Sequence, residues 1–168
     1  MFEWVHKFHK CVWGVAHVPL SWFGFYAEGR EEEDSYFFSL RLSLNEVERL
    51  LWVNGFVRNP TSFLTYRKVE RGSEVERDYT KGSWVKYLDE PWDDYQVHIT
   101  LYSAFDDGFV DVYGHYELSW LRHPIKHLKT VDYSVEKGKS YFEENVVSGF
   151  VSDKVVVRDF EERVDTDG

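Results

Sequence analysis

Histidine, hydroxyl and carboxylate side chains are spread among apolar residues in the stretch YQVHITLYSAFDDGFVDVYGHYELSW, residues 95–120. His98 and Thr100 are two residues apart, and so are His115 and Glu117. Side chains two residues apart on a β-strand point to the same side of a sheet. An imidazole can transfer protons or bind a ligand near neutral pH, and a neighbouring polar group can assist it. These four residues are therefore the first candidates for a functional site.

The dipeptide Asp107-Gly108 predicts a two-residue turn between two antiparallel strands. Such a turn predicts three cross-strand pairs on one side of the hairpin: Thr100 with His115, His98 with Glu117, and Tyr102 with Tyr113. The opposite side is apolar and must face the core. The polar side is then either a solvated surface or the floor of a site that is covered by the N-terminal segment or by RHPIKH, residues 122–127.

The candidates for catalysis are His98, Thr100 and His115. The candidates for ligand binding come from the same hairpin and the segment after it: Glu117, Tyr102, Tyr113, Arg122 and Trp120. An arginine close to a tryptophan can stack on its ring or bind a carboxylate or phosphate. Arg122 and Arg67 are the cations that we would test first for anion binding. The alternative for Arg122 is that it only neutralises Glu117.

The tripeptide His98-Ile99-Thr100 resembles one half of the signature of the 2H phosphoesterases, whose two H-x-[ST] motifs lie on strands that face each other across a cleft. The resemblance covers this tripeptide and the apolar residue after it. It implies that paired histidines act as acid and base on a phosphodiester while the hydroxyls hold its phosphate. A second motif is missing, because His17 is followed by Val-Pro and His115 by Tyr-Glu.

Metal binding is a further possible chemistry of the histidines. His123 and His127 have the i, i+4 spacing that places two imidazoles on one helical face, but HPIKH lacks the glutamate of the metalloprotease motif. His6 and His9 form another pair, at i, i+3. Either pair needs a third ligand from the hairpin, and the sequence does not show that they converge. We therefore expect no metal and no cofactor, and His123 and His127 are the candidate ligands if a metal binds.

Mostly β-strands are predicted to position these residues. The strand patterns are SYFFSLRLSL (35–44), a charged hairpin over 62–79, GSWVKYL (82–88), the two strands of the 95–118 hairpin, and a last strand over 153–160. Ser43 and Glu46 form a capping box and Asn54-Gly55 ends the segment, which predicts a helix over about 44–54. Shorter helical segments are predicted near the N-terminus, where an edge strand is the alternative, and after the hairpin. We predict an α+β fold with a mainly antiparallel sheet of five to seven strands.

Composition limits the possible functions. The 168 residues predict one domain over 1–158 and an acidic, mobile tail over 159–168. Aromatic residues make up 18% of the chain, which favours a sheet or, alternatively, a platform for stacking bases or sugars. A net charge of −10 without a basic run argues against nucleic-acid binding. Cys11 is the only cysteine and no stretch predicts a transmembrane helix, which together indicate a cytoplasmic protein.

No complete catalytic signature is present. We therefore predict a non-catalytic binding or assembly module, with an unknown protein partner or self-association, whose ligand site lies on the polar side of the 95–118 hairpin. The alternative is a small phosphoester hydrolase or nucleotide-processing enzyme that uses His98, Thr100 and His115.

Overall fold

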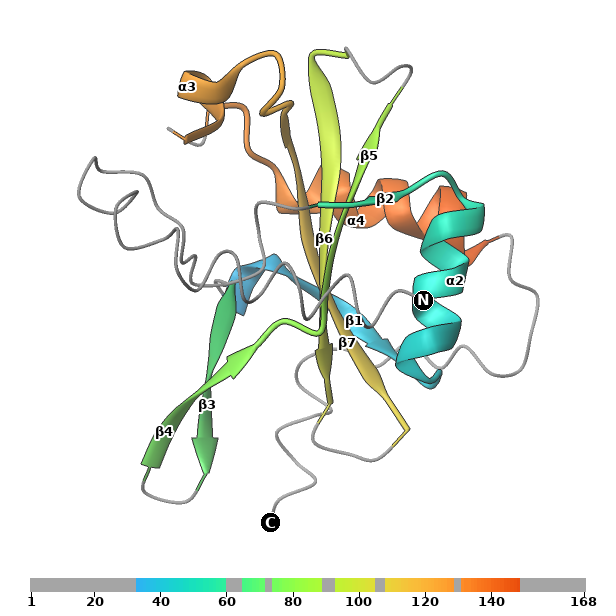
Figure 1. Cartoon of the computed structure of the whole chain (residues 1–168), viewed down its shortest axis with the longest axis vertical. Coiled ribbons are helices and arrows are strands. Elements are labelled where there is room, and N and C mark those ends of the chain that lie inside the picture. Colours follow the sequence, from blue (N-terminus) through green and yellow to red (C-terminus); the bar gives the residue numbers. More distant parts are fainter. Residues whose placement is uncertain are drawn as a thin grey trace.

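The computed structural model describes residues 33–59, 65–71, 74–88, 93–104, 108–128 and 131–148. Within these ranges, five strands form a central antiparallel sheet in the order β1-β7-β6-β5-β2 (Figure 1). Its strands are β1 (Tyr36–Leu40), β2 (Val57–Arg58), β5 (Gly82–Tyr87), β6 (Tyr95–Ser103) and β7 (Val110–Leu118). A separate antiparallel pair contains β3 (Tyr66–Arg71) and β4 (Glu74–Tyr79). The predicted α+β fold with a mainly antiparallel sheet is confirmed.

Among the described residues, one α-helix lies between β1 and β2 and two follow β7. They are α2 (Leu44–Val53), α3 (Pro124–Leu128) and α4 (Val135–Phe142), together with a 3₁₀ turn at Glu33–Ser35 and a π-helical turn at Glu143–Val147 that continues α4. None of these helices has both the length and the apolar character needed to cross a membrane.

The capping box predicted for α2 is present. The backbone N–H of Ser43 donates to Glu46 Oε2 at 2.9 Å, and the N–H of Glu46 donates to Ser43 Oγ at 3.4 Å. Gly55 has a φ of 82°, a left-handed conformation that glycine adopts without the steric cost of a side chain, and the helix ends before it. The buried side chains of α2 are Val47, Leu50 and Leu51. The helix predicted over about 44–54 is therefore confirmed.

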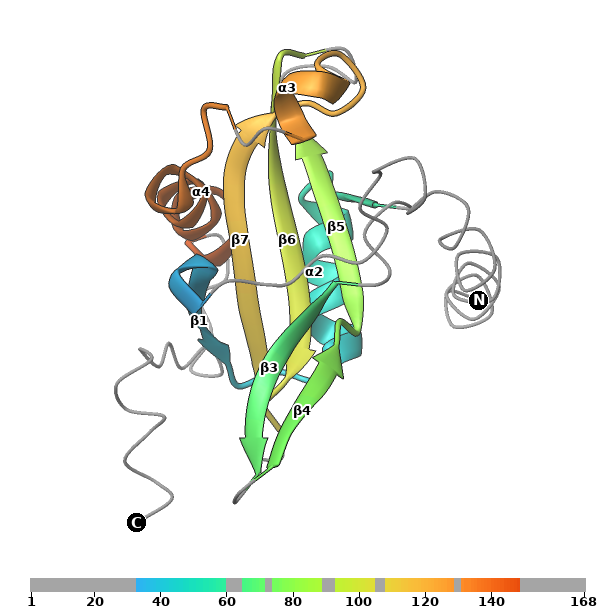
Figure 2. The ribbon, with the colours of Figure 1, turned by 90° about the vertical axis from the view of Figure 1, so that its left-hand side faces the viewer.

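The central sheet has one apolar face and one polar face. In Figure 1, α2 lies to the right of the sheet and α4 passes behind the strands towards the same side, whereas α3 and the β3–β4 hairpin lie to the left and face the viewer in Figure 2. The core on the helix side includes side chains from the sheet and from both helices: Phe37, Phe38, Val97, Ile99, Leu101, Val112, Val47, Leu50, Leu51 and Phe142. The intervening residues of β6 and β7 point to the opposite side, because successive side chains alternate along a strand. They carry the predicted polar groups.

The pairing of β6 with β7 differs from the predicted one. His98 pairs with His115, Thr100 with Tyr113, and Tyr102 with Asp111, so each predicted cross-strand partner is wrong. The observed pairs are centred one residue earlier than an Asp107-Gly108 turn would place them: Ser103 pairs with Val110, and the N–H of Ala104 donates to the carbonyl of Phe109 at 3.1 Å. The register therefore shifts by two residues, and an even shift keeps every side chain on its predicted face. The separation into a polar and an apolar face is confirmed.

Several other elements match their predictions. The charged hairpin is present as β3–β4, GSWVKYL forms β5, and the helical segments after the central hairpin are α3 and α4. The N-terminal helix or edge strand, the last strand over 153–160 and the tail over 159–168 lie outside the described residues.

Gly138 allows α4 to approach β7 closely. A Cβ atom at this position would lie 2.8 Å from the Cα and carbonyl carbon of His115 and 2.9 Å from the nitrogen of Tyr116. Real Cβ atoms do not approach a backbone so closely. The glycine therefore sets the distance between α4 and the part of β7 that carries His115.

We expect Gly138→Ala to destabilise the protein by roughly 1–3 kcal/mol, because α4 must move away from β7 to accommodate the methyl group. Helix propensity alone predicts the opposite, a gain of about 1 kcal/mol. Chemical denaturation at fixed pH measures the free energy of unfolding. Ser140→Ala, on an exposed position of the same helix, is the matched control. A stabilised Gly138→Ala protein would show that the close contact does not limit packing.

Candidate functional site

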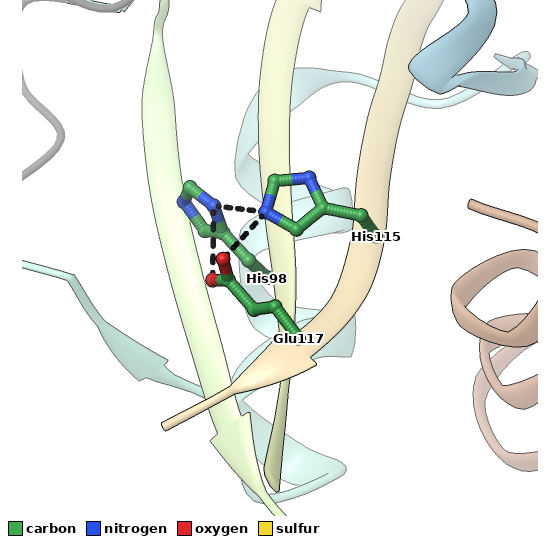
Figure 3. A group of neighbouring side chains, drawn as sticks. All are labelled: His98, His115 and Glu117. Atoms are coloured by element: carbon green, nitrogen blue, oxygen red, sulfur yellow. Dashed lines mark hydrogen bonds and ion pairs between the residues drawn. The ribbon is translucent and has the colours of Figure 1, made fainter. Parts of the chain in front are cut away.

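The two histidines of the central hairpin face each other at the centre of the polar side. His98 of β6 and His115 of β7 are direct cross-strand partners, and their ring planes are at 80° to one another. His98 Nδ1 lies 3.3 Å from His115 Nε2 (Figure 3). Glu117, two residues further along β7, places Oε2 at 3.2 Å from His115 Nε2 and Oε1 at 3.8 Å from His98 Nδ1. Two imidazole nitrogens and a carboxylate thus converge on one point.

Three neighbouring side chains hold this group in place. Ser83 Oγ lies 2.8 Å from His98 Nε2, and Gln96 Nε2 donates to Glu117 Oε1 at 2.9 Å. His127 of α3 places Nδ1 at 3.2 Å from Glu117 Oε2 and at 2.9 Å from the carbonyl oxygen of Leu118. A hydrogen on His98 Nε2 that is donated to Ser83 leaves the lone pair of Nδ1 directed at the cluster.

Burial sets the protonation of the group. His98 and Glu117 are both buried. Desolvation, with the nearby charge of His115 adding to it, lowers the pKa of His98 to about 3. Burial alone raises the pKa of Glu117, but the charge and hydrogen bond of His115 and the charges of the other two imidazoles lower it below the ordinary value overall. At neutral pH the site therefore contains a neutral His98 beside an ionised carboxylate.

The predicted pair His123 and His127 does not act together. His123 Nε2 lies 2.8 Å from Asp94 Oδ1, whereas His127 contacts Glu117. Arg122 also binds Asp94, with its Nε at 3.1 Å from Oδ1. Segment 122–127 contacts the polar face through the ion pair of His127 with Glu117. This segment is one of the two that could cover the polar side according to the sequence.

A second polar cluster occupies the other end of the same face. The guanidinium of Arg67 pairs with Asp111 and Asp78, and it lies over the rings of Tyr102 and Tyr113 at 4.8 and 5.8 Å from their centroids. Two carboxylates already bind Arg67, so it does not have the free charge expected of an anion-binding residue. The predicted ligand-binding tyrosines pack on this arginine.

Two predicted site residues remain, Thr100 and Trp120. Thr100 is buried on β6 between the two clusters, and Trp120 is half-buried just after β7. Ser83 and Gln96 are the site residues that the sequence prediction did not include. Gln96 was identifiable, because it lies two residues before His98 on the same side of its strand. Ser83 required the pairing of β5 with β6, which the sequence does not reveal.

Comparison of the chain with protein-family models, with curated proteins and with solved structures found no match. The chemistry of the site is therefore inferred from its geometry alone.

We expect the free energy of unfolding of the metal-free protein to fall as the pH is lowered from about 6.5 towards 4. The unfolded chain takes up a proton at His98 near its ordinary pKa of 6.5, whereas the folded protein does so only near about 3. The unfolded state then binds more protons between these values, and the loss is about 1 kcal/mol for each pH unit.

Urea denaturation of wild-type and His98→Gln protein in the presence of a chelator, at several pH values, measures this dependence. Glutamine retains a polar partner for Ser83 but does not titrate, so the variant is expected to show a shallower slope. Equal slopes in the two proteins would contradict the burial of a neutral imidazole at this position.

Proposed function

We propose that the protein is a metal-ion-binding protein, and that His98 Nδ1, His115 Nε2 and a Glu117 oxygen are the ligands of a divalent transition-metal ion. The observation that supports this most is the spacing of the donors. His98 Nδ1 and His115 Nε2 are 3.3 Å apart, Glu117 Oε2 is 3.2 Å from His115 Nε2, and the other carboxylate oxygen, Oε1, is 3.8 Å from His98 Nδ1. Ligands about 2.0–2.1 Å from a tetrahedral zinc ion are about 3.4 Å from one another. An ion at the centre of the group would need only small adjustments of the side chains.

The same distances favour a metal site over a simple hydrogen-bonded network. Hydrogen bonds between an imidazole and a carboxylate are typically about 2.7–2.9 Å long when one partner is charged. All three separations in the cluster exceed that range. The His115–Glu117 contact is at the long end of an ordinary hydrogen bond and the other two contacts are longer, whereas all three separations are close to those between ligands of a common ion.

The chemical types of the donor atoms, and the hydrogen bonds that orient them, also fit a metal site. Imidazole nitrogen and carboxylate oxygen are ligands that zinc and its neighbours in the transition series accept. Metal-binding histidines and carboxylates are usually oriented by hydrogen bonds from a second layer of residues. Ser83 orients His98, while Gln96 and His127 orient Glu117. Among the described residues, His98, His115 and Glu117 form a group whose ligand atoms, one from each side chain, all lie within 4.8 Å of one another.

The ligand that we propose for the predicted binding module is thus a metal ion bound on the polar side of the hairpin. The proposed ligands differ from His123 and His127, which the sequence offered as candidate ligands if a metal binds. A protein partner, or self-association, stays a prediction.

A hydrolase that uses His98 and His115 as acid and base has less support. The acid–base mechanism implied by the resemblance to 2H phosphoesterases needs a phosphate between two histidines, with each ring within about 2.6–3.2 Å of a phosphate oxygen or its bridging atom. His98 and His115 are themselves only 3.3 Å apart at their closest nitrogens, which leaves no room for a phosphate between them.

Isothermal titration calorimetry of chelator-treated protein with Zn²⁺ tests the proposal. We expect one equivalent to bind to the wild type and the affinity to fall by at least roughly 100-fold in His98→Gln and in Glu117→Gln, because each variant loses a direct ligand. His123→Ala is the matched control and should bind as the wild type does, because His123 contacts Asp94 outside the cluster.

Thermal unfolding of each metal-free variant confirms that it is folded before the titration is interpreted. Wild-type protein that binds no Zn²⁺, or glutamine variants that bind it as tightly as the wild type, would overturn the proposal.

A further inference from the structure

We infer that the ion held by His98, His115 and Glu117 keeps an exchangeable solvent ligand, so that the site takes small anions and has the open coordination of a catalytic centre. This inference rests on the proposed metal binding and adds the ligand class of the site. Structural zinc sites have four protein ligands, whereas catalytic ones have three and a water molecule. The number of protein donors in the cluster therefore decides whether one coordination position of the ion stays open to solvent.

Three donors converge in the described part of the chain. His127 is the next imidazole, but its Nδ1 lies 2.9 Å from the carbonyl oxygen of Leu118 and 3.2 Å from Glu117 Oε2. Both neighbours are acceptors, so the nitrogen carries a hydrogen and donates it. Nδ1, the His127 nitrogen that faces Glu117, therefore has no lone pair to offer an ion. We assign His127 as a positioning residue that orients Glu117.

Gln96 supplies an independent indication of a solvent molecule. Its side chain is fully buried, and its amide nitrogen donates to Glu117 Oε1 at 2.9 Å. Among the described residues, the amide oxygen of the same group is buried without a hydrogen-bond partner. Such a buried acceptor costs about 1–3 kcal/mol and is usually satisfied by water or a ligand. A water molecule bound to the ion next to Glu117 has hydrogens to donate to it.

The amide orientation of Gln96 is determined by the same contact. Rotating the amide by 180° would place its oxygen against the ionised Glu117, where two acceptors would repel each other. The amide nitrogen is therefore the atom that binds Glu117, and the amide oxygen next to it is the atom without a partner among the described residues.

The cluster is accessible to small molecules. The side chains of His98, His115 and Glu117 are 11%, 13% and 9% exposed, so the ligands are not sealed from solvent. Next to them lie two more exposed residues, His127 with 25% of its side chain exposed and Tyr133 with 38% of the residue exposed. The ring of Tyr133 lies 4.5 Å from that of His115. Solvent can therefore reach the cluster along its exposed edge.

An exchangeable water is what hydrolytic metal sites use as their nucleophile, because a bound metal ion makes water a stronger acid. The open position therefore gives the enzyme alternative a different chemical basis from the paired histidines of the 2H phosphoesterases. The ligand class that we assign to the site is that of small oxygen or nitrogen anions that can replace water on the ion.

Visible absorption of the Co²⁺-substituted protein, titrated with sodium azide, tests this inference. We expect a saturable change in the cobalt bands as azide replaces the solvent ligand. His127→Ala should bind Co²⁺ about 10- to 100-fold more weakly, because Glu117 loses a supporting contact, and should keep the azide response. Gln96→Leu should bind Co²⁺ and change the azide affinity, because the acceptor for the solvent ligand is lost.

The outcomes separate the two proposals. Absence of stoichiometric Co²⁺ binding would mean that the metal site itself is wrong. One equivalent of bound Co²⁺ whose spectrum does not respond to azide would leave the metal site intact and overturn the open position. An azide response that appears in His127→Ala but not in the wild type would identify His127 as a fourth ligand, which also overturns it.

Discussion

The hydrogen-bonded pairing of β6 with β7 is the interaction on which the rest of this structure depends. These two strands are the longest in the central sheet, and their register places His98 opposite His115. The same register directs the apolar side chains of both strands towards α2 and α4. A slip of one residue would exchange the two faces, burying the imidazoles in the core and exposing the apolar residues. Core packing therefore protects the geometry of the site.

The two polar clusters on the other face show two ways of burying charge. At one end, Arg67 is matched by two carboxylates and two aromatic rings, and it joins the β3–β4 hairpin to Asp111 of the central sheet. At the other end, one carboxylate is surrounded by three imidazoles, of which His98 is neutral at physiological pH. The first cluster is complete with protein groups alone. The second contains donors that point at a common centre and a buried amide oxygen that has no partner among the described residues, so it is the one suited to a ligand.

Much of this arrangement could be predicted from local sequence signals. Helix α2 was predictable because its cap and its end are determined by neighbouring residues, Ser43, Glu46 and Gly55. The faces of the hairpin followed from alternation, and so His98, His115 and Glu117 were predicted on one side. Their exact partners were not predictable, because the register depends on the connection after Ser103, and the Asp-Gly dipeptide indicated a shorter turn. The contributions of Ser83 and His127 depend on tertiary packing between separate elements, which no local pattern encodes.

The three proposed ligands are contributed by a single hairpin, within residues 98–117. The chain that must be ordered to bring them together is short, and the entropy lost in closing a loop grows only slowly with its length. An ion can therefore bind as soon as this hairpin has formed, before α2 or α4 has docked. Binding at that stage would favour the native register over its alternatives, because only one alignment of the two strands places both imidazoles and the carboxylate around one centre. The ion would then stabilise the correct register of β6 and β7 during folding, in addition to binding the folded protein.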